Sequence, residues 1–456
     1  MRIKNLKFTI IIFLGIIAVT SGFRCKFITP GEQKLLEPIE LTWWGTFDDP
    51  QNFIEIIADY RLIHPNIKIN YRKLREEEFE KELLDALAED RGPDIFSIKN
   101  YDLDKWQPKI EPLPATITMA YQVTKKSLGI KEETLTEIRE TNSLTSGKIK
   151  ERFLDVVYGD AVREEQIYGL PLSVDTLVMF YNRDLFNNAG LPLPPKTWPE
   201  LQVFTKKLTY QDNAGNLIQS GTALGTAENI ENYTEILSLL MMQNGAQMMR
   251  GDKVFFYNLP SSDNSTYNPG PEALRFYTDF AGISKEVYTW NNSFSNSIDS
   301  FVQGKVAIIF GYNYHLPFIE AKRQGKLNYA VAPTPQIEGR NDVNIANYWL
   351  QSVSKKSEYI NEAWDFLQFA TSQKEVEKYL ETTKRPAALR ALIENQINSD
   401  ELTIFAQQLL TSTSWYHGKN YQAVQSAFAE MINSMLAGTE AEKAAQIAAQ
   451  KIQQTL

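Results

Sequence analysis

The chain has 456 residues, a length that predicts two or three packed units rather than one core. Of these residues 43% are hydrophobic and 23% are charged, which is the composition of a globular protein. Its 47 Lys and Arg against 56 Asp and Glu give a net charge of -9, and no basic tract follows the N-terminus, which argues against nucleic-acid binding. One Cys and three His exclude an internal disulfide framework and a cysteine-based zinc site, and argue against a histidine-rich metal centre, so we expect no metal and no cofactor.

The N-terminus has the layout of an export signal. Arg2, Lys4 and Lys7 precede an almost wholly apolar run at residues 8–19, which is short for a membrane span. We therefore assign residues 1–25 to an export signal or membrane anchor, and residues 26–38 to a polar tether.

The only cysteine, Cys25, closely follows the apolar run and looks like the acylation site of a lipoprotein. The match is imperfect, because Phe23 and Arg24 stand where a lipobox has small residues. An uncleaved N-terminal anchor and a plain secretory signal are the alternatives. In each case the globular part faces the outside of the cytoplasmic membrane, and a lipid on Cys25 or a signal anchor would tether it there.

Strand and helix patterns alternate at the start of the folded part. Alternating and β-prone residues predict strands at 39–44, 67–71 and 95–98, and apolar residues at helical spacing predict helices at 53–63 and 79–87. The order strand, helix, strand, helix, strand predicts a parallel sheet with right-handed crossovers.

The segment 112–160 is more polar, and we interpret it as an elaboration of this first unit with helical patches around residues 121–128 and 153–157. Beyond it the patterns predict further helices and strands. The helices are expected at 201–208, 234–244, 272–281 and 360–370, and from 401 to the end with breaks at 412–420 and 438; the strands are expected at 306–310, 327–332 and 348–352.

Residues 168–201 contain an unusual placement of polar groups. Asp175 and Thr176 interrupt an apolar, β-prone run, and a buried carboxylate needs a partner. Further on, Thr197 followed by Glu200 has the spacing of a capping box, which predicts the start of a helix. Trp198 then belongs to the packing of that helix rather than to a binding site.

Six segments in order resemble one family, the extracytoplasmic solute-binding proteins of bacterial ABC importers, in the sugar-binding branch that includes maltose-binding protein. The resemblance extends over residues 39–456. The segments are TWWGTFDD (42–49), HPNIKINY (64–71), GPDIF (92–96), YGLPLSVDTLVMFYNRDLFNNAGLPLPPKTWPEL (168–201), FVQGKVAIIFGYNYHLP (301–317) and SVSKKSEYINEAWDFLQFATS (352–372).

This resemblance implies an α/β fold of the type II periplasmic binding proteins: two lobes, each an open and mostly parallel sheet flanked by helices, joined by hinge strands around a ligand cleft. The chain would cross between lobes at 173–176, 349–353 and 411–415. The first lobe would comprise residues 39–174 and 351–412, and the second residues 175–350 and the C-terminal helices 413–456.

By the same comparison Asp175 and Thr176 lie at the first hinge, where Asp175 would accept hydrogen bonds from ligand hydroxyls; the alternative is a hinge-stabilising or capping acid. Trp43 and Trp44 end the first strand, and because successive strand residues point to opposite faces, at most one faces the cleft. Asp48 follows in the next loop, where it either binds ligand or caps a helix.

Aromatic residues supply the other candidates. Tyr314 stands where many relatives carry a cleft tryptophan, with Tyr312 beside it, and a Tyr can both stack on a sugar and donate a hydrogen bond. Trp349, Tyr421 and Tyr101 are further candidates, each with a core or structural alternative. Of the remaining polar residues, His64 is expected to end a helix and the acids 76–78 to form a solvated helix start; Asn100, His315 and His417 stay open.

The resemblance therefore predicts a non-enzymatic, monomeric protein that captures a sugar or other small polar solute by closure of its lobes and delivers it to a membrane permease. An exported glycoside hydrolase with paired carboxylates is the alternative in another class, although the sequence has no Gly-x-Ser-x-Gly elbow, HExxH or Gly-rich phosphate loop. Within the same fold, a phosphorylated polyol, a peptide or a polyamine are alternative ligands.

Overall fold

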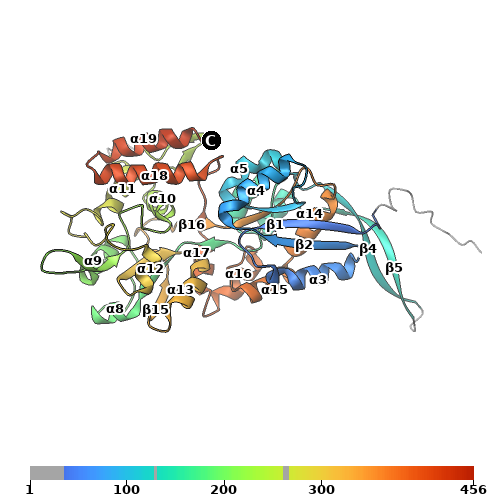
Figure 1. Ribbon diagram of the computed structural model, residues 1–456, viewed down its shortest axis with the longest axis horizontal. Helices are drawn as coiled ribbons and strands as arrows, with labels where there is room; N and C mark the ends of the chain where they lie inside the picture. Colours follow the sequence, from blue (N-terminus) through green and yellow to red (C-terminus); the bar gives the residue numbers. More distant parts are fainter. Residues whose placement is uncertain (1–34, 128–130, 260–266) are drawn as a thin grey trace, which may run out of the picture.

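A computed structural model describes residues 35–127, 131–259 and 267–456 (Figure 1). The predictions for the export signal and for Cys25 concern residues outside these ranges. Within them, buried hydrophobic residues form two separate large clusters, which we call the cores of the first and second lobe. The two lobes lie side by side, with the C-terminal helices on the second lobe (Figure 1).

The first lobe is built on a sheet with the strand order β17-β3-β1-β2. Strands β1, β2 and β3 are parallel to one another, as their alternation with helices predicts, and β17 is antiparallel to β3. The strands are β1 (Ile39–Gly45), β2 (Ile67–Lys73), β3 (Ile95–Lys99) and β17 (Trp349–Val353). Its main helices are α3 (Ile54–Ile63), α4 (Glu76–Ala88), α5 (Leu103–Trp106), α6 (Ser146–Arg152), α7 (Asp155–Ala161), α14 (Ile360–Ala370), α15 (Gln373–Thr383) and α16 (Arg390–Ile397), and short elements are η1 (Pro50–Phe53), η2 (Asn100–Asp102), η3 (Gln107–Lys109), β6 (Val162–Arg163) and β7 (Gln166–Ile167).

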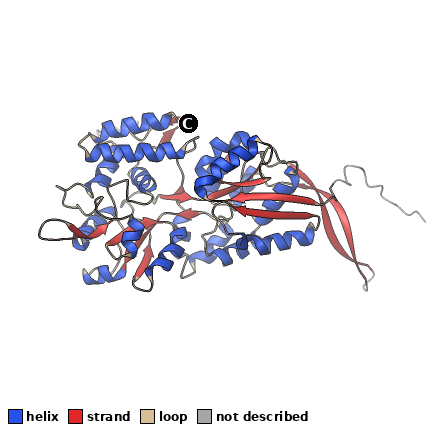
Figure 2. Cartoon of the chain, in the orientation of Figure 1, coloured by secondary structure: helices blue, strands red, loops and turns tan. Residues whose placement is uncertain are grey.

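A long antiparallel hairpin projects from the first lobe, away from the second (Figures 1 and 2). Its strands are β4 (Thr116–Ser127) and β5 (Lys131–Asn142). The predicted helical patch at 121–128 is therefore wrong. The segment forms a strand because its apolar residues alternate: Ile117 and Met119 are both buried against the lobe, and a period of two specifies a strand.

The second lobe has a five-stranded sheet in the order β10-β11-β14-β9-β15. Only β11 and β14 are parallel; β9 runs antiparallel to both β14 and β15, and β10 to β11, so this sheet is mixed rather than mostly parallel. The strands are β9 (Val178–Asn182), β10 (Tyr210–Gln211), β11 (Leu217–Thr222), β14 (Val306–Gly311) and β15 (Tyr329–Ala332), with a separate ribbon of β12 (Met249–Arg250) and β13 (Lys253–Val254).

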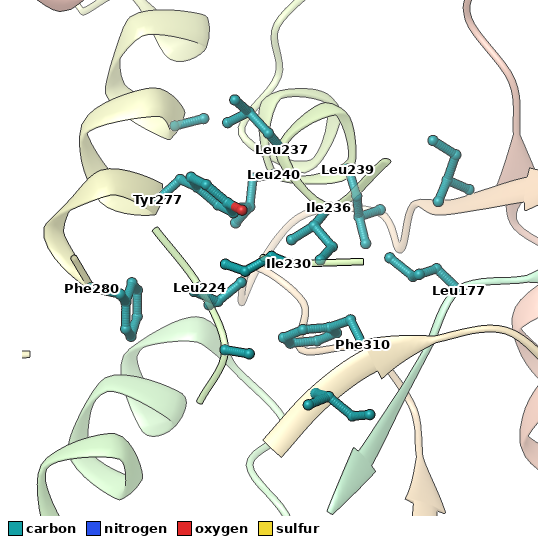
Figure 3. Packing of buried hydrophobic residues seen from close by; sticks show 14 of the residues in the cluster. Leu177, Leu224, Ile230, Ile236, Leu237, Leu239, Leu240, Tyr277, Phe280 and Phe310 are labelled. Carbon is teal, nitrogen blue, oxygen red and sulfur yellow. The ribbon is translucent and has the colours of Figure 1, made fainter. Parts of the chain in front are cut away.

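Helix α10 lies in the centre of the second core (Figure 3). It is apolar on almost every side, with Leu237 and Leu239 fully buried, which is the pattern of a helix enclosed by other elements. The helices of this lobe are α8 (Arg183–Asn188), α9 (Trp198–Leu208), α10 (Tyr233–Gln243), α11 (Pro269–Asp279), α12 (Ser297–Val302), η4 (Asn313–His315), α13 (Leu316–Arg323), α18 (Tyr421–Leu436) and α19 (Ala441–Gln453).

Helix α9 begins as the sequence predicts. The side chain of Thr197 accepts a hydrogen bond from the backbone N–H of Glu200, and the Glu200 carboxylate accepts one from the N–H of Thr197, so the capping box is confirmed. Trp198 then lies in the second core, where its indole N–H donates to Gln243 at 2.6 Å. This local signal fixes where the second lobe starts its first long helix.

A small sheet connects the two lobes. It has the order β18-β16-β8, with β8 (Asp175–Thr176), β16 (Asn344–Asn347) and β18 (Ser412–Thr413), and α17 (Thr403–Leu409) packs beside it. We call it the hinge sheet. The first and third expected crossings contain β8 and β18. The second was placed too late: residues 349–353 form β17 inside the first sheet, and the chain crosses at β16.

Candidate functional site

Thr176 is a structural residue of the hinge sheet. Its hydroxyl donates to the Ile345 carbonyl at 3.1 Å and accepts from the Ser412 hydroxyl at 2.9 Å, and the side chain is fully buried. These bonds join all three hinge strands through one side chain. The structure therefore gives Thr176 a hinge role rather than a place on the cavity wall.

Asp175 lies at the border between hinge and cleft. Its carboxylate accepts hydrogen bonds from three backbone N–H groups, those of Thr176 at 2.8 Å, Asn313 at 3.1 Å and Tyr314 at 3.3 Å. Burial raises the pKa of Asp175 to about 7, and the three donors and nearby Arg385 only partly offset that. Asp175 therefore caps the start of η4, and it also lines the cavity between the lobes.

The cavity between the lobes, which we call the central cavity, is almost filled by aromatic side chains. Its volume is about 20 Å³, enough for about one water molecule. The rings of Phe47 and Trp349 are stacked with centroids 6.4 Å apart, and Tyr314 meets Phe47 edge-on at 6.1 Å. Its lining includes Phe47, Asp48, Lys99, Asp175, Tyr314, Asn347, Trp349 and Arg385. The lobes are thus closed on one another at this point.

Asp48 is held by protein groups. It is buried, and one of its oxygens accepts from the Tyr379 hydroxyl at 2.9 Å, from the Asn52 amide at 3.1 Å and from the Arg385 guanidinium. Arg385 in turn lies over the ring of Phe47, with Cζ 3.8 Å from the centroid. Asp48 therefore orients Arg385, a cation on the cleft floor that no sequence pattern indicated.

A larger space opens beside the central cavity, and we call it the mouth chamber. It has a volume of about 760 Å³ and lies between α4 and η2 of the first lobe and the start of α18 of the second. It shares Lys99 and Trp349 with the central cavity, and Lys99 Nζ lies 4.2 Å from the Trp349 ring centroid. Its lining includes Glu76, Glu77, Lys99, Tyr101, Asp102, Trp349, Lys419, Asn420 and Tyr421.

Tyr101 and Tyr421 form an aromatic contact across the cleft. Their rings are stacked with centroids 3.9 Å apart, one from η2 and the other from the start of α18. The Tyr421 hydroxyl donates to buried Glu235 at 2.8 Å, and burial raises the pKa of Glu235. Burial also raises the pKa of Asp102, in the same chamber, to about 6. The chamber thus combines stacking faces with carboxyl groups.

Next to Tyr314, the second lobe contains two polar atoms without a hydrogen-bond partner in the described part of the chain. Tyr312 is fully buried and stacks on Tyr314, with ring centroids 5.4 Å apart, yet its hydroxyl meets no acceptor there. The amide nitrogen of Asn232 is likewise without an acceptor, while its oxygen receives the Tyr314 hydroxyl at 3.4 Å. A buried donor without a partner is costly, but neither residue lines the central cavity or the mouth chamber, so we do not count these groups among the ligand contacts.

Neither tryptophan of the first strand reaches the cleft. Trp43 is fully buried in the first core, where its indole N–H donates to Gln351 at 3.0 Å. Trp44 points to the opposite side and lies under Arg72, whose Cζ is 4.9 Å from its ring. The chain presents Phe47 instead, because the cleft begins in the loop beyond the strand rather than at its last residues.

The remaining polar candidates have structural partners. His64 follows α3, as expected, and its Nδ1 lies 2.9 Å from the Ala120 carbonyl. Asn100 and His417 both contact buried Asp160, each at 2.8 Å. His315 accepts the backbone N–H of Tyr312, and burial lowers the pKa of His315 to about 4. The acids at 76–78 are exposed in the first turn of α4, also as expected.

Among the described residues, no cluster of three or more His, Cys, Asp or Glu side chains is placed to hold a metal ion. Over the same residues, no helix has both the length and the apolarity of a membrane span.

Two α/β lobes, a hinge sheet between them and a cleft lined by aromatic and ionisable side chains define a two-lobed binding protein. The profile of a family described as "Bacterial extracellular solute-binding protein" matches residues 44–377. Because this match covers most of the chain, the protein belongs to that family, which confirms the expected family and its class of binding proteins rather than enzymes.

Two curated relatives match about half of the chain. A maltodextrin-binding protein of Bacillus subtilis is 28% identical over 252 residues, 52% of this chain and 54% of that protein. A galactooligosaccharide-binding protein of the same species is 28% identical over 267 residues, 54% of this chain and 57% of that protein. The chain thus spans about half the length of these relatives.

The fold is also shared with solved structures. A cyclic alpha-maltosyl-1,6-maltose binding protein from Arthrobacter globiformis superimposes with a TM-score of 0.69 at 17% sequence identity, covering 91% of this chain and 98% of that chain. At this identity the likeness concerns the fold alone, and it confirms the expected two-lobed α/β architecture.

Proposed function

We propose that this protein is the extracytoplasmic binding component of an ABC importer, and that it captures a sugar or short oligosaccharide between its lobes and delivers it to a membrane permease. The observation that carries the proposal is the cleft between the lobes, where aromatic faces alternate with carboxyl, amide and hydroxyl groups. Carbohydrates have apolar ring faces and many hydroxyls, so they need both. The relatives named for maltodextrin and galactooligosaccharide binding support it.

The mechanism is closure around the hinge sheet. Phe47 of the first lobe meets Tyr314 of the second, and Tyr101 meets Tyr421, so opening would separate both pairs. A solute that contacts both lobes stabilises the closed state by its preference for that state. We include in this proposal the division of the chain into lobes given above, with the second crossing moved to β16, and a single chain as the working unit.

Two alternative ligand classes find less support. A phosphate would call for a free helix N-terminus or free basic side chains, but the start of η4 is capped by Asp175, Arg385 donates to Asp48, and Lys99 lies 3.8 Å from Glu76. A polyamine would call for available carboxylates, but Asp48 accepts from Arg385 and Tyr379, and Asp175 accepts three backbone N–H groups. In the mouth chamber, Glu76 and Glu80 form ion pairs with Lys99 and Lys105. Neutral solutes rich in hydroxyls make no such demand.

The test is calorimetric titration of the full chain in detergent with a panel of monosaccharides, disaccharides and oligosaccharides, beside a polyamine, a phosphorylated polyol and a peptide. We expect at least one carbohydrate to bind. Trp349→Ala should weaken that binding, whereas Tyr210→Ala, which removes an aromatic ring exposed on β10, should not. Binding only by a non-sugar, or hydrolysis of a glycoside, would refute the carbohydrate assignment.

A further inference from the structure

We propose that Phe47 blocks the centre of the cleft, so that the solute is a mono- or disaccharide bound in the mouth chamber rather than a longer chain lying through the whole cleft. This inference rests on the proposed function. It adds the size class of the ligand and the residue that sets it.

The ring of Phe47 is held on three sides. The Arg385 guanidinium lies on one side, with Cζ 3.8 Å from the ring centroid. Trp349 stacks with the ring at an interplanar angle of 27°, and Tyr314 of the second lobe meets it at 89°. Arg385 is itself fixed, because it donates to both Asp48 and the Tyr379 hydroxyl. Phe47 is therefore a fixed part of the wall.

The free volume differs between the two parts of the cleft. The central cavity around Phe47 measures about 20 Å³, whereas the mouth chamber on the other side of Trp349 and Lys99 measures about 760 Å³. Pockets for small ligands commonly measure ~300–1,000 Å³. Of these two parts of the cleft, the mouth chamber is the one with room for a ligand, and a longer glycan that also entered the central cavity would have to displace the Phe47 ring.

The mouth chamber has the groups that a small sugar needs. Trp349, Tyr101 and Tyr421 provide aromatic surface on the chamber wall, with Lys99 over the Trp349 ring and the two tyrosines stacked on each other, and Lys99 and Asp102 provide a donor and an acceptor near them. Lys99 is suited to a ligand oxygen, because its nearest carboxylate, that of Glu76, is 3.8 Å away and well exposed. Truncating Phe47 leaves all of these groups in place.

The experiment compares the full-length wild type with Phe47→Ala, titrated with glucose, maltose and maltotetraose and with the corresponding mannose and galactose series. We expect the wild type to bind a mono- or disaccharide about tenfold more tightly than the tetrasaccharide, and Phe47→Ala to bring the two within about threefold by strengthening tetrasaccharide binding. Phe47→Leu, which keeps an apolar side chain, should lie between them and serves if the alanine variant does not fold.

Phe318→Ala is the matched control, since Phe318 is also a partly exposed ring with a cation over it, Lys322 Nζ at 4.1 Å, but lies on α13. It should retain the wild-type preference. The inference is overturned if the wild type already prefers the tetrasaccharide, or if Phe47→Ala leaves the preference unchanged. If no sugar binds either protein, the carbohydrate function itself fails, and the inference fails with it.

Discussion

Asp175→Ala should change the pH dependence of stability in a defined direction. Burial raises the pKa of Asp175 from 3.8 to about 7, so between these values the native protein holds a proton that the unfolded chain has released. The free energy of unfolding therefore falls as pH rises from about 4 to about 7, because the unfolded state binds fewer protons. Each pH unit in this window costs about 1.4 kcal/mol, so Asp175 should lower wild-type stability by about 3 kcal/mol between pH 5 and pH 8.

The variant also loses a structural contribution. Removing the carboxylate leaves the N–H groups of Thr176, Asn313 and Tyr314 without their acceptor. At about 1 kcal/mol for each net hydrogen bond, Asp175→Ala should be less stable than the wild type by about 3 kcal/mol at pH 5. The difference should shrink towards zero at pH 8, where the wild type carries a buried charge.

The assay is urea unfolding of both proteins at intervals from pH 5 to pH 8. Groups common to both proteins cancel in the difference between the two free energies of unfolding. A difference that stays constant over this range would refute the reasoning about the pKa, and a difference that grows with pH would mean that the carboxylate is stabilised as the anion by its three donors.

Three further predictions concern single side chains. Trp198→Ala should lower the free energy of unfolding by about 4 kcal/mol at every pH, because a buried indole is lost, yet leave sugar affinity unchanged. Weakened sugar binding, or a loss of stability that varies with pH as in Asp175→Ala, would contradict the separate roles assigned to hinge and core. Trp349→Ala should weaken sugar binding at least about tenfold with little change in melting temperature, measured by calorimetry and thermal unfolding, and unchanged affinity would remove Trp349 from the site. His315→Gln should reduce the fall in the free energy of unfolding at acid pH. Burial lowers the pKa of His315 to about 4, so the wild type loses about 3 kcal/mol of stability as pH falls from 6.5 to 4. An equally steep loss in the variant, measured by urea unfolding, would show that other groups cause it.

Local patterns predicted most elements of the fold. The capping box at Thr197 and Glu200 specifies the start of α9, and the apolar surroundings of Leu237 and Leu239 specify a buried helix. Such signals lie within a few residues of one another, so they act before any tertiary contact forms. The hairpin was not predicted from the sequence, because the polar composition of the segment obscures the alternation with a period of two that is present in it.

The sequence predicted where in the fold the site lies, but only some of the residues that line it. Asp175, Tyr314, Trp349, Tyr101 and Tyr421 all line the cleft, since the resemblance places their segments at the ends of strands that face it. Which of Trp43 and Trp44 would face the cleft was left open, and neither lines it, because the direction of neighbouring strand residues depends on how the sheet packs against α14 and its neighbours. Phe47 lies between two candidates, Trp44 and Asp48, but was not itself predicted.

By itself, the sequence determined the order of elements, the start of the second lobe and the chemical types available for a cleft, because period, capping and composition are local properties. Only the tertiary structure decided that Arg385 lies over Phe47, that Asp48 and Tyr379 hold Arg385, and that Lys99 lies beside Trp349. Asp48 and Arg385 are 337 residues apart along the chain. No local pattern links such distant positions; it is the folding of the first lobe, to which both segments belong, that brings them together.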